Sequence, residues 1–329
     1  MFSARYVITL LLVIGHILSF TVFLAENEFV WIIRVFSVIP AIVFLRKIFK
    51  ISDLIILSIY LLSIRDVRSL YYIIIYISII LVVRNCSKEF LKVSRVCLTC
   101  ILFINLFLVY APQGLIETWE LRGGSGVRQY SGIFTSPTSL GLILVLSFTR
   151  GLGYKNSIFS AMSIFLGLLT RSRQYLIGLI LALWRHRWLR LVLITVIIIK
   201  GQVLWKIINI SNIDGRILGS RTEVYELFYL FIKENFGIFG LGLGSSSIVV
   251  ESYLGHDYSF HSSYLNLIVE MGVLSIVVIF MFLRKFIETR LLVFVLLSFT
   301  TSIFDYPTAL LFPWVYWLTN ESITSYRSI

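Results

Sequence analysis

The sequence predicts an all-α, polytopic transmembrane protein with about twelve membrane-spanning helices. Apolar residues make up 58% of the 329 positions and charged residues only 14%, and the mean hydropathy is +0.92. Long apolar runs recur from the first residues to the last, and short clusters of Lys and Arg separate them. A soluble domain of this length exposes far more charge, so most of the surface is expected to face lipid.

The apolar runs define the expected spans in chain order. A straight span needs about 20 residues, and the shorter runs either use flanking Arg and Lys side chains that reach the interface or form broken or re-entrant helices. The runs are Tyr6–Ala25, Phe29–Leu45, Leu54–Ile64, Leu70–Val83, Val96–Ala111, Ile133–Thr149, Ile158–Thr170, Tyr175–Trp184, Leu191–Ile199, Ser263–Leu283, Leu291–Phe304 and Thr308–Thr319. We expect residues 1–329 to form one integral membrane domain, with a long extracytoplasmic loop, residues 200–262, inserted before the span that starts near residue 263.

The distribution of basic residues orients these spans. With the N-terminus in the cytoplasm and every run crossing, the inside loops carry 17 Lys and Arg residues against four acids, and the outside loops carry 11 against 12. Short inside loops of membrane proteins are enriched in Lys and Arg. Both termini are therefore expected in the cytoplasm, and topology accounts for the net charge of +12 without a nucleic-acid partner.

The three cysteines predict neither a disulfide framework nor a metal site. Cys97 and Cys100 have C-x-x-C spacing but lie within an apolar run, and there is no second pair. We therefore interpret them as small buried hydrophobic residues. No cofactor is expected.

The long outer segment contains a predicted amphipathic helix at the membrane face. In the stretch SRTEVYELFYLFIKENFG, Ser220 and Glu223 fit a capping box and Gly237 fits the end of the helix. Its apolar stripe, at helical spacing, consists of Val224, Leu227, Phe228 and Phe231. The second outer segment long enough to fold is residues 112–132.

Basic residues and glycines flank this helix. Arg221 falls in its first turn, where the helix dipole disfavours a cation, and Arg216 lies five residues earlier. Two arginines beside free helix N–H groups favour a bound anion. After the helix, the segment GIFGLGLGSSS, with Gly242 and Gly244, forms either a flexible turn or a backbone that closely approaches a sugar or phosphate.

Further candidate residues lie on the same expected side of the membrane. Arg171 and Arg173 stand at the outer end of one run and the start of the next, where Lys and Arg are less frequent. His256 and His261 are two of the four histidines in the chain, and they precede the span that starts near residue 263. An imidazole pKa of about 6.5 suits a general base at neutral pH.

One acidic residue, Glu270, lies about two helical turns inside that span. An ionisable residue within a membrane is a functional candidate by default. We nevertheless favour a structural role for Glu270, paired with a buried base such as Arg34.

Four segments, in order, resemble the O-antigen ligase and polymerase superfamily of bacterial envelope glycosyltransferases. GIFTSPTSLG (132–141) is similar to the family's G-x-F-x-x-P-N-x-L segment, and SRQYLIGL (172–179) is similar to its S-R-G segment. Residues 219–247 resemble the block S-G-R-T-x-x-W that ends in P-x-x-G-x-G-x-G, and HSSYLNLIVEMGVLS (261–275) resembles the signature H-N-x-x-L-x-x-x-x-E-x-G-x-x-G. Departures from these patterns include Thr138, Gln174, Ser220, Tyr225 and Gly237.

The resemblance implies a metal-independent transferase at the outer face of the bacterial inner membrane, acting on glycans linked to undecaprenyl diphosphate. Arg173 and Arg221 would hold the diphosphate and stabilise the charge that develops on it as it leaves. His261 would accept the proton of the acceptor hydroxyl or orient that hydroxyl. Further substrate contacts are expected at Arg171, Arg216, His256, Gly242 and Gly244. The chain contains no D-x-D metal pair, which agrees with arginines in place of a metal.

The sequence is compatible with three functions. A polysaccharide polymerase would transfer the glycan to a lipid-linked repeat unit, and it is favoured because the outer loops are modest and these polymerases vary most in sequence. A ligase would transfer the same glycan to a lipid A core. A transporter of the lipid-linked oligosaccharide predicts internal repeats and charged residues at the membrane midplane. The expected partners are the lipid bilayer, the lipid-linked oligosaccharide, a chain-length regulator and a flippase.

Overall fold

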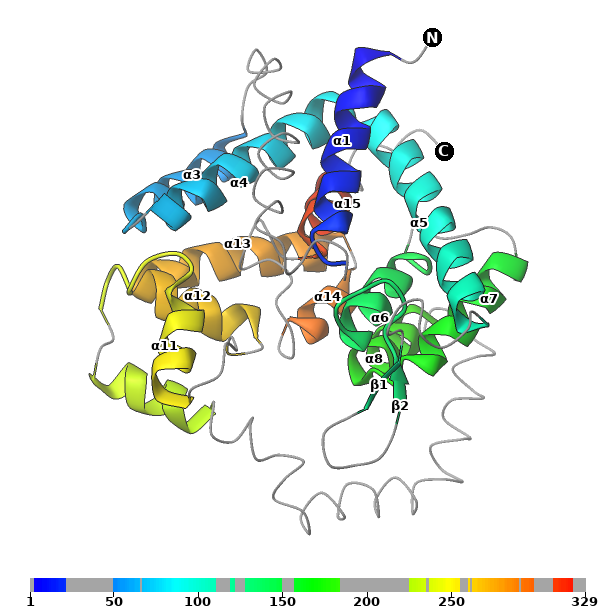
Figure 1. Cartoon of the computed structure of the whole chain (residues 1–329). Coiled ribbons are helices and arrows are strands. Elements are labelled where there is room, and N and C mark those ends of the chain that lie inside the picture. The colour runs from blue at the N-terminus through cyan, green and yellow to red at the C-terminus, as the bar shows by residue number, and fades with distance from the viewer. Residues whose placement is uncertain are drawn as a thin grey trace.

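The part of the chain that the computed structural model describes is mostly helical, which confirms the all-α class (Figure 1). The described residues are 3–21, 50–65, 67–110, 119–121, 128–149, 157–183, 225–234, 237–254, 260, 262–289, 291–298 and 310–321. The expected runs at residues 29–45 and 191–199 lie outside them, as does Arg34.

The helices and one small hairpin follow in chain order. The helices are α1 (Ala4–Leu18), α3 (Ile51–Leu62), α4 (Val67–Asn85), α5 (Ser87–Val109), α6 (Pro137–Leu146), α7 (Ser157–Leu169), α8 (Arg173–Leu183), α11 (Ser245–Leu254), α12 (Ser263–Met271), η1 (Gly272–Leu274), α13 (Ser275–Glu288), α14 (Leu292–Leu297) and α15 (Phe312–Glu321). A further helix covers residues 225–234. The strands β1 (Trp119–Leu121) and β2 (Arg128–Tyr130) pair antiparallel within the predicted outer segment 112–132.

Two predicted boundaries are wrong in the amino-terminal half. Helix α5 begins at Ser87 instead of Val96, because Phe90 and Val93 are buried and extend its apolar face by helical spacing. Three basic residues assigned to a loop therefore lie on its first turns: Lys88, Lys92 and Arg95. Helix α6 has only ten residues, so at roughly 15 Å it covers about half of a hydrocarbon core of about 30 Å, as expected for one of the broken or re-entrant segments.

The predicted span 263–283 is interrupted. Gly272 ends α12 with a φ of 56°, and a short 3₁₀ turn leads into α13, which continues to Glu288. A Cβ at Gly272 would lie 1.9 Å from the carbonyl oxygen of Gly237. Backbone from another segment therefore occupies the space that a side chain would need at this break.

Two helical stretches of the described chain are long and apolar enough to cross a membrane, judged by length and composition. They are Ser87–Val109 and Ser263–Glu288. In α13, which forms the second part of Ser263–Glu288, both the buried and the exposed face carry apolar side chains. The side chains that point into the core are Val278, Phe282 and Phe286, and those exposed on the opposite face are Ile276, Val277 and Phe280. An outer face that is itself apolar is typical of a helix against lipid.

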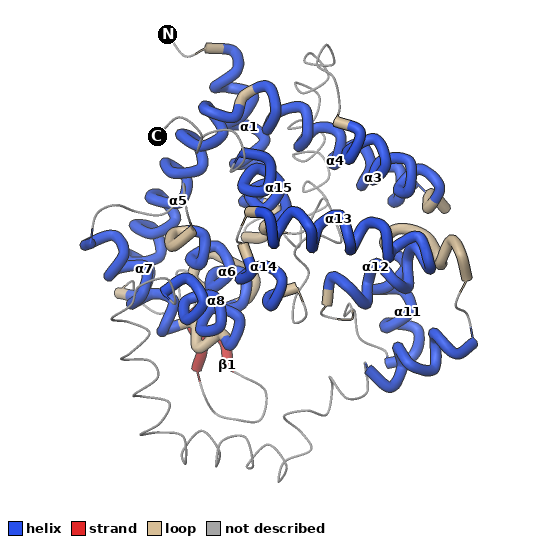
Figure 2. Tube along the Cα trace, turned by 180° about the vertical axis from the view of Figure 1, so that it is seen from behind, coloured by secondary structure: helices blue, strands red, loops and turns tan. Residues whose placement is uncertain are grey.

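Helix α15 lies inside the main hydrophobic core, among α1, α4, α5 and α13 (Figure 2). Trp314 is fully buried, and its Nε1 donates a hydrogen bond to the Ser94 hydroxyl of α5 at 3.0 Å. Its ring lies 5.9 Å from the ring of His16 in α1. Phe312 packs against Phe282 of α13 with ring centres 6.3 Å apart. These contacts join the two ends of the chain in one core.

The hairpin and the segment after it are attached to α5. Tyr130, fully buried, donates its hydroxyl to the carbonyl oxygen of Asn105 at 2.5 Å, and burial raises the pKa of Tyr130. The Asn105 side chain accepts the backbone N–H of Ile133 at 3.1 Å. Gly132, with a φ of 60°, lies so close that a Cβ would fall 1.6 Å from the Asn105 Oδ1. The family-like segment 132–141 therefore starts from a fixed position.

The predicted burial of Cys97 is confirmed, whereas that of Cys100 is wrong. Cys97 is buried and Cys100 is exposed. The two residues are three apart, but only Cys97 continues the buried stripe of α5 together with Leu98, Ile101 and Leu102.

Candidate functional site

The start of α12 is held by contacts on both sides of position 261. The Ser262 hydroxyl donates to the carbonyl oxygen of Ser298 at 3.2 Å, and the Ser263 N–H donates to the same oxygen at 2.9 Å. On the other side, the Phe260 N–H donates to the Asn266 side chain at 3.1 Å. His261 itself lies outside the described residues, but the chain immediately before and after it is anchored.

The helix over residues 225–234 packs against the same region. Phe228 meets the buried ring of Phe260 with centres 5.6 Å apart and planes at 77°. Leu227 and Phe231 are buried, which confirms the predicted apolar stripe at these positions. They belong to a second hydrophobic cluster that also contains Val249, Val250, Phe260 and Val269. Position 221 is only four residues before this helix, but Arg221, Arg216 and His256 lie outside the described residues.

The turn before α8 has an unusual backbone at Arg171. Arg171 has a φ of 49° and is the single non-glycine residue with positive φ in the described part of the chain. The Thr170 hydroxyl bonds to the Gly167 carbonyl at 2.6 Å and receives the Ser172 N–H at 3.2 Å. Non-glycine residues with positive φ are uncommon and cluster at functional sites. Arg171 is exposed at the tip of this turn.

Helix α8 starts at Arg173 and is packed closely on its neighbours. The Tyr175 N–H donates to the Ser172 hydroxyl at 3.3 Å, and the Tyr175 hydroxyl donates to the Ser163 carbonyl of α7 at 3.2 Å. A Cβ at Gly167 would lie 2.0 Å from the Tyr175 ring. On another side α8 packs against α14, the helix that precedes Ser298. The backbone position of Arg173 is therefore well defined.

The glycine segment after the 225–234 helix lies against α12 and the end of α3. Gly242, with a φ of 103°, donates its N–H to the Glu270 carbonyl at 2.9 Å. A Cβ there would lie 2.3 Å from the Arg65 Cγ. Gly244, with a φ of 83°, is also buried. Gly242 therefore permits a close approach, and the approach seen there is to protein. Substrate contacts at Gly242 and Gly244 stay a prediction.

Glu270 caps a helix. It is fully buried, and its Oε1 accepts the N–H of Ser246 at 3.2 Å. Ser246 is the second residue of α11, so the carboxylate lies at the positive end of that helix dipole. This contact gives Glu270 a structural role, as expected, and the partner seen is the α11 backbone. The expected pairing with Arg34 lies outside the described residues.

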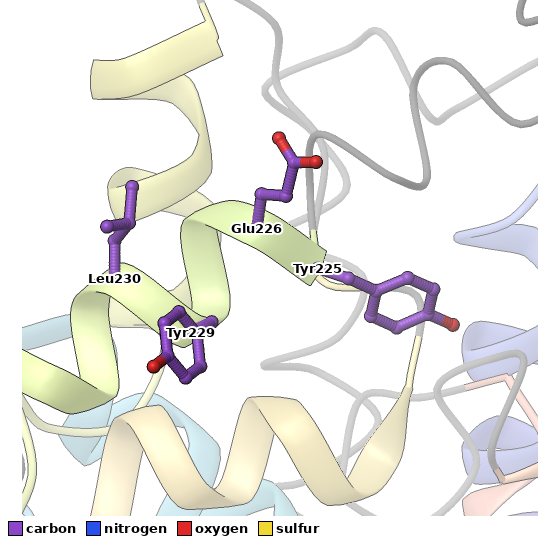
Figure 3. A pocket seen from close by; sticks show the side chains of 4 residues that line it. All are labelled: Tyr225, Glu226, Tyr229 and Leu230. Carbon is purple, nitrogen blue, oxygen red and sulfur yellow. The ribbon is translucent and has the colours of Figure 1, made fainter.

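An open pocket lies along the exposed face of the 225–234 helix. It has a volume of about 480 Å³, and its described lining is Tyr225, Glu226, Tyr229 and Leu230. Glu226 and Leu230, one turn apart, point to one side, and the two tyrosine rings point to others (Figure 3). Tyr225 stands where the family pattern has Trp. Within the described residues no group of three His, Cys, Asp or Glu side chains could hold a metal ion.

A buried charged cluster was missed at the sequence level, because its members were assigned to loops or to an apolar run. Asp53 of α3 is fully buried and forms an ion pair with Arg84 at the end of α4. The Arg84 Nε donates to the Tyr316 hydroxyl of α15 at 3.1 Å. The Lys285 ammonium of α13 lies 5.6 Å from the centre of the Tyr316 ring. We call these four residues the inner charge cluster.

No protein-family model, curated protein or solved structure matches the chain.

Proposed function

We propose that the chain is an integral membrane glycosyltransferase of the O-antigen polymerase type, located in the bacterial inner membrane. It transfers a glycan from undecaprenyl diphosphate to a lipid-linked repeat unit. The reaction takes place on the extracytoplasmic face, and the bilayer is crossed by about twelve helices with both termini in the cytoplasm.

The main support is a chain of contacts that links the segments next to the three proposed catalytic residues. Helix α8, which begins at Arg173, packs against α14. The residue after α14, Ser298, binds Ser262 and Ser263 beside His261. The Phe228–Phe260 contact adds the helix that follows Arg221. Segments more than eighty residues apart in the sequence thus belong to one connected region, as a shared site requires.

The contacts also agree with the expected membrane topology, because they join helix ends that positive-inside bias places on the same side. The pairs on the expected outside are Phe20 with Thr135, and Ser63 with Leu243. The pairs on the expected inside are Asp53 with Arg84, and Ser87 with Trp317. Each of these four pairs joins residues expected on the same side, which supports the antiparallel order of the spans.

The proposed reaction is a substitution at the anomeric carbon of the donor sugar. An acceptor hydroxyl forms the new C–O bond while the bond from that carbon to the diphosphate oxygen breaks. His261 takes the hydroxyl proton. Arg173 and Arg221 stabilise the negative charge on the departing undecaprenyl diphosphate, and planar guanidinium groups suit this contact because they donate two parallel hydrogen bonds.

The test compares two histidine variants in a host deleted for the gene. Wild-type protein is expected to restore a ladder of surface glycan on a gel, whereas His261→Ala should leave single repeat units on the acceptor. The control is His186→Ala, at a histidine in a predicted inside loop, which should restore the ladder. Both variants are first quantified in the membrane fraction. A wild-type ladder with His261→Ala at equal abundance contradicts the catalytic assignment.

The same experiment separates the alternatives. Bare acceptor together with polymer accumulating on the lipid carrier identifies a ligase. A transporter is distinguished by purified protein, because only a transferase turns over lipid-diphosphate glycan without ATP or added metal.

A further inference from the structure

The inner charge cluster carries more positive than negative charge. Arg84 and Lys285 are its cations, and Asp53 is its one carboxylate. The ammonium of Lys285 also interacts electrostatically with Lys50, a third cation, and with Glu288. Glu288 is engaged elsewhere, because it accepts the Arg284 Nε at 2.7 Å on the exposed side of α13. The described surroundings therefore leave the cluster with an excess of positive charge.

Hydrogen bonding in the cluster is also incomplete. Within the described residues, the buried Lys285 Nζ donates no hydrogen bond, whereas the Arg84 Nη2 is engaged in the ion pair with Asp53, whose other oxygen, Oδ1, is buried without a hydrogen-bond donor. A lysine ammonium has three donors, and burying a charged donor without an acceptor is costly. The Tyr316 ring offsets part of this cost for Lys285 through its negative face. An external acceptor with negative charge would satisfy the Lys285 ammonium and offset the excess of positive charge.

The position of the cluster indicates where such an acceptor would come from. All three cations lie at helix ends that positive-inside bias assigns to the cytoplasmic side. Large apolar side chains are exposed beside them, with Ile51 at the start of α3 77% exposed and Ile287 at the end of α13 62% exposed. A headgroup phosphate with acyl chains alongside matches this combination of an exposed Lys50, partly buried Arg84 and Lys285, and apolar surface.

We propose that the inner charge cluster binds the phosphate of an anionic phospholipid of the inner leaflet, with Lys285 and Arg84 as its hydrogen-bond donors. This site lies at the opposite ends of the helices from the proposed glycosyl-transfer site. It does not depend on the transferase assignment, although it requires the predicted membrane orientation.

The test measures the melting of purified protein in a neutral detergent by tryptophan fluorescence. Short-chain phosphatidylglycerol is expected to raise the apparent melting temperature of the wild type by roughly 2–4 °C, whereas short-chain phosphatidylcholine should not. Lys285→Met should lose at least half of this shift, and Lys285→Arg should keep it. The matched control is Arg284→Met, one residue away and already paired on the surface, which should respond as the wild type does.

Three results overturn the proposal. The first is an equal response of the wild type to both lipids, and the second is a full response of Lys285→Met. The third is the same shift from inorganic phosphate alone, which would assign the site to a soluble anion instead of a lipid. If Lys285→Met does not fold, Lys285→Gln provides the comparison, because it keeps a polar group and removes the charge.

Discussion

The ion pair between Asp53 and Arg84 provides a quantitative test of how α3 and α4 are arranged. Arg84→Met keeps most of the length of the side chain and removes its guanidinium. Asp53 then stays buried, and it still accepts a hydrogen bond from the Lys50 N–H at 3.3 Å. Asp53→Asn removes the opposite charge and retains an oxygen that can accept the same N–H, which caps the start of α3.

The expected magnitude follows from the burial of the two side chains. Removing one partner of a buried ion pair costs about 3–5 kcal/mol, because the other charge is left without compensation. The Asp53 side chain is 0% exposed and that of Arg84 is 15% exposed, so water reaches one partner. We therefore expect Arg84→Met to lower the free energy of unfolding by about 3 kcal/mol, at the lower end of that range.

The double variant separates pairing from the effects of each side chain alone. Asp53→Asn combined with Arg84→Met removes both charges, so no buried charge is left without its partner. The double variant should therefore cost less than the sum of the two single variants, by about 2 kcal/mol or more. The assay is equilibrium unfolding in mixed micelles with a rising fraction of a denaturing detergent, followed by far-ultraviolet circular dichroism. Arg284→Met, at the exposed pair with Glu288, is the control and should leave unfolding unchanged.

One result would refute this reasoning. If the two single costs add to the cost of the double variant within about 0.5 kcal/mol, the two side chains do not interact. Helices α3 and α4 would then not bring residues 53 and 84 together.

The remaining predictions concern the break in α12–α13 and the arginine at the start of α8. Gly272→Ala should lower the free energy of unfolding by more than about 2 kcal/mol in the same assay, because it combines positive φ with a clash against the Gly237 carbonyl. The control is Val273→Ala, at an exposed side chain. Equal stability of the two variants would argue against the close approach. Arg173→Lys should markedly reduce chain extension, because an ammonium cannot replace a guanidinium that donates two parallel hydrogen bonds. Normal extension with Arg173→Lys would indicate that Arg173 only reaches toward the membrane interface.

Several local features of the fold could be predicted from the order of the residues. The apolar stripe of Leu227 and Phe231 follows helical spacing, and both side chains are buried as expected. Gly237 was predicted to end that helix and is indeed not helical. Such features depend on residues within a few turns of one another, where spacing and capping are readable. The extent of α5 was missed for the opposite reason, since charged residues on its exposed face resemble a loop.

The candidate site residues stay a prediction. The family-like segments point to positions 173, 221 and 261, and the contacts through Ser298 and Phe260 join segments close to them. The helix-capping role of Glu270 could not be predicted, because its partner lies 24 residues away on another helix and is a backbone N–H. The open pocket beside Tyr225 and Tyr229 likewise depends on which face of the helix is left uncovered.

By itself, the sequence determined that this protein is helical and apolar and where most helices lie, because hydropathy acts within single segments. It also predicts on which side of a membrane the basic ends belong. Only the tertiary structure decided which segments meet. It brought Asp53, Arg84 and Lys285 together from three helices, and it placed Glu270 at the start of α11. The physical reason is that a buried charge is stable only beside its partners, and those partners are set by helix packing across the whole chain.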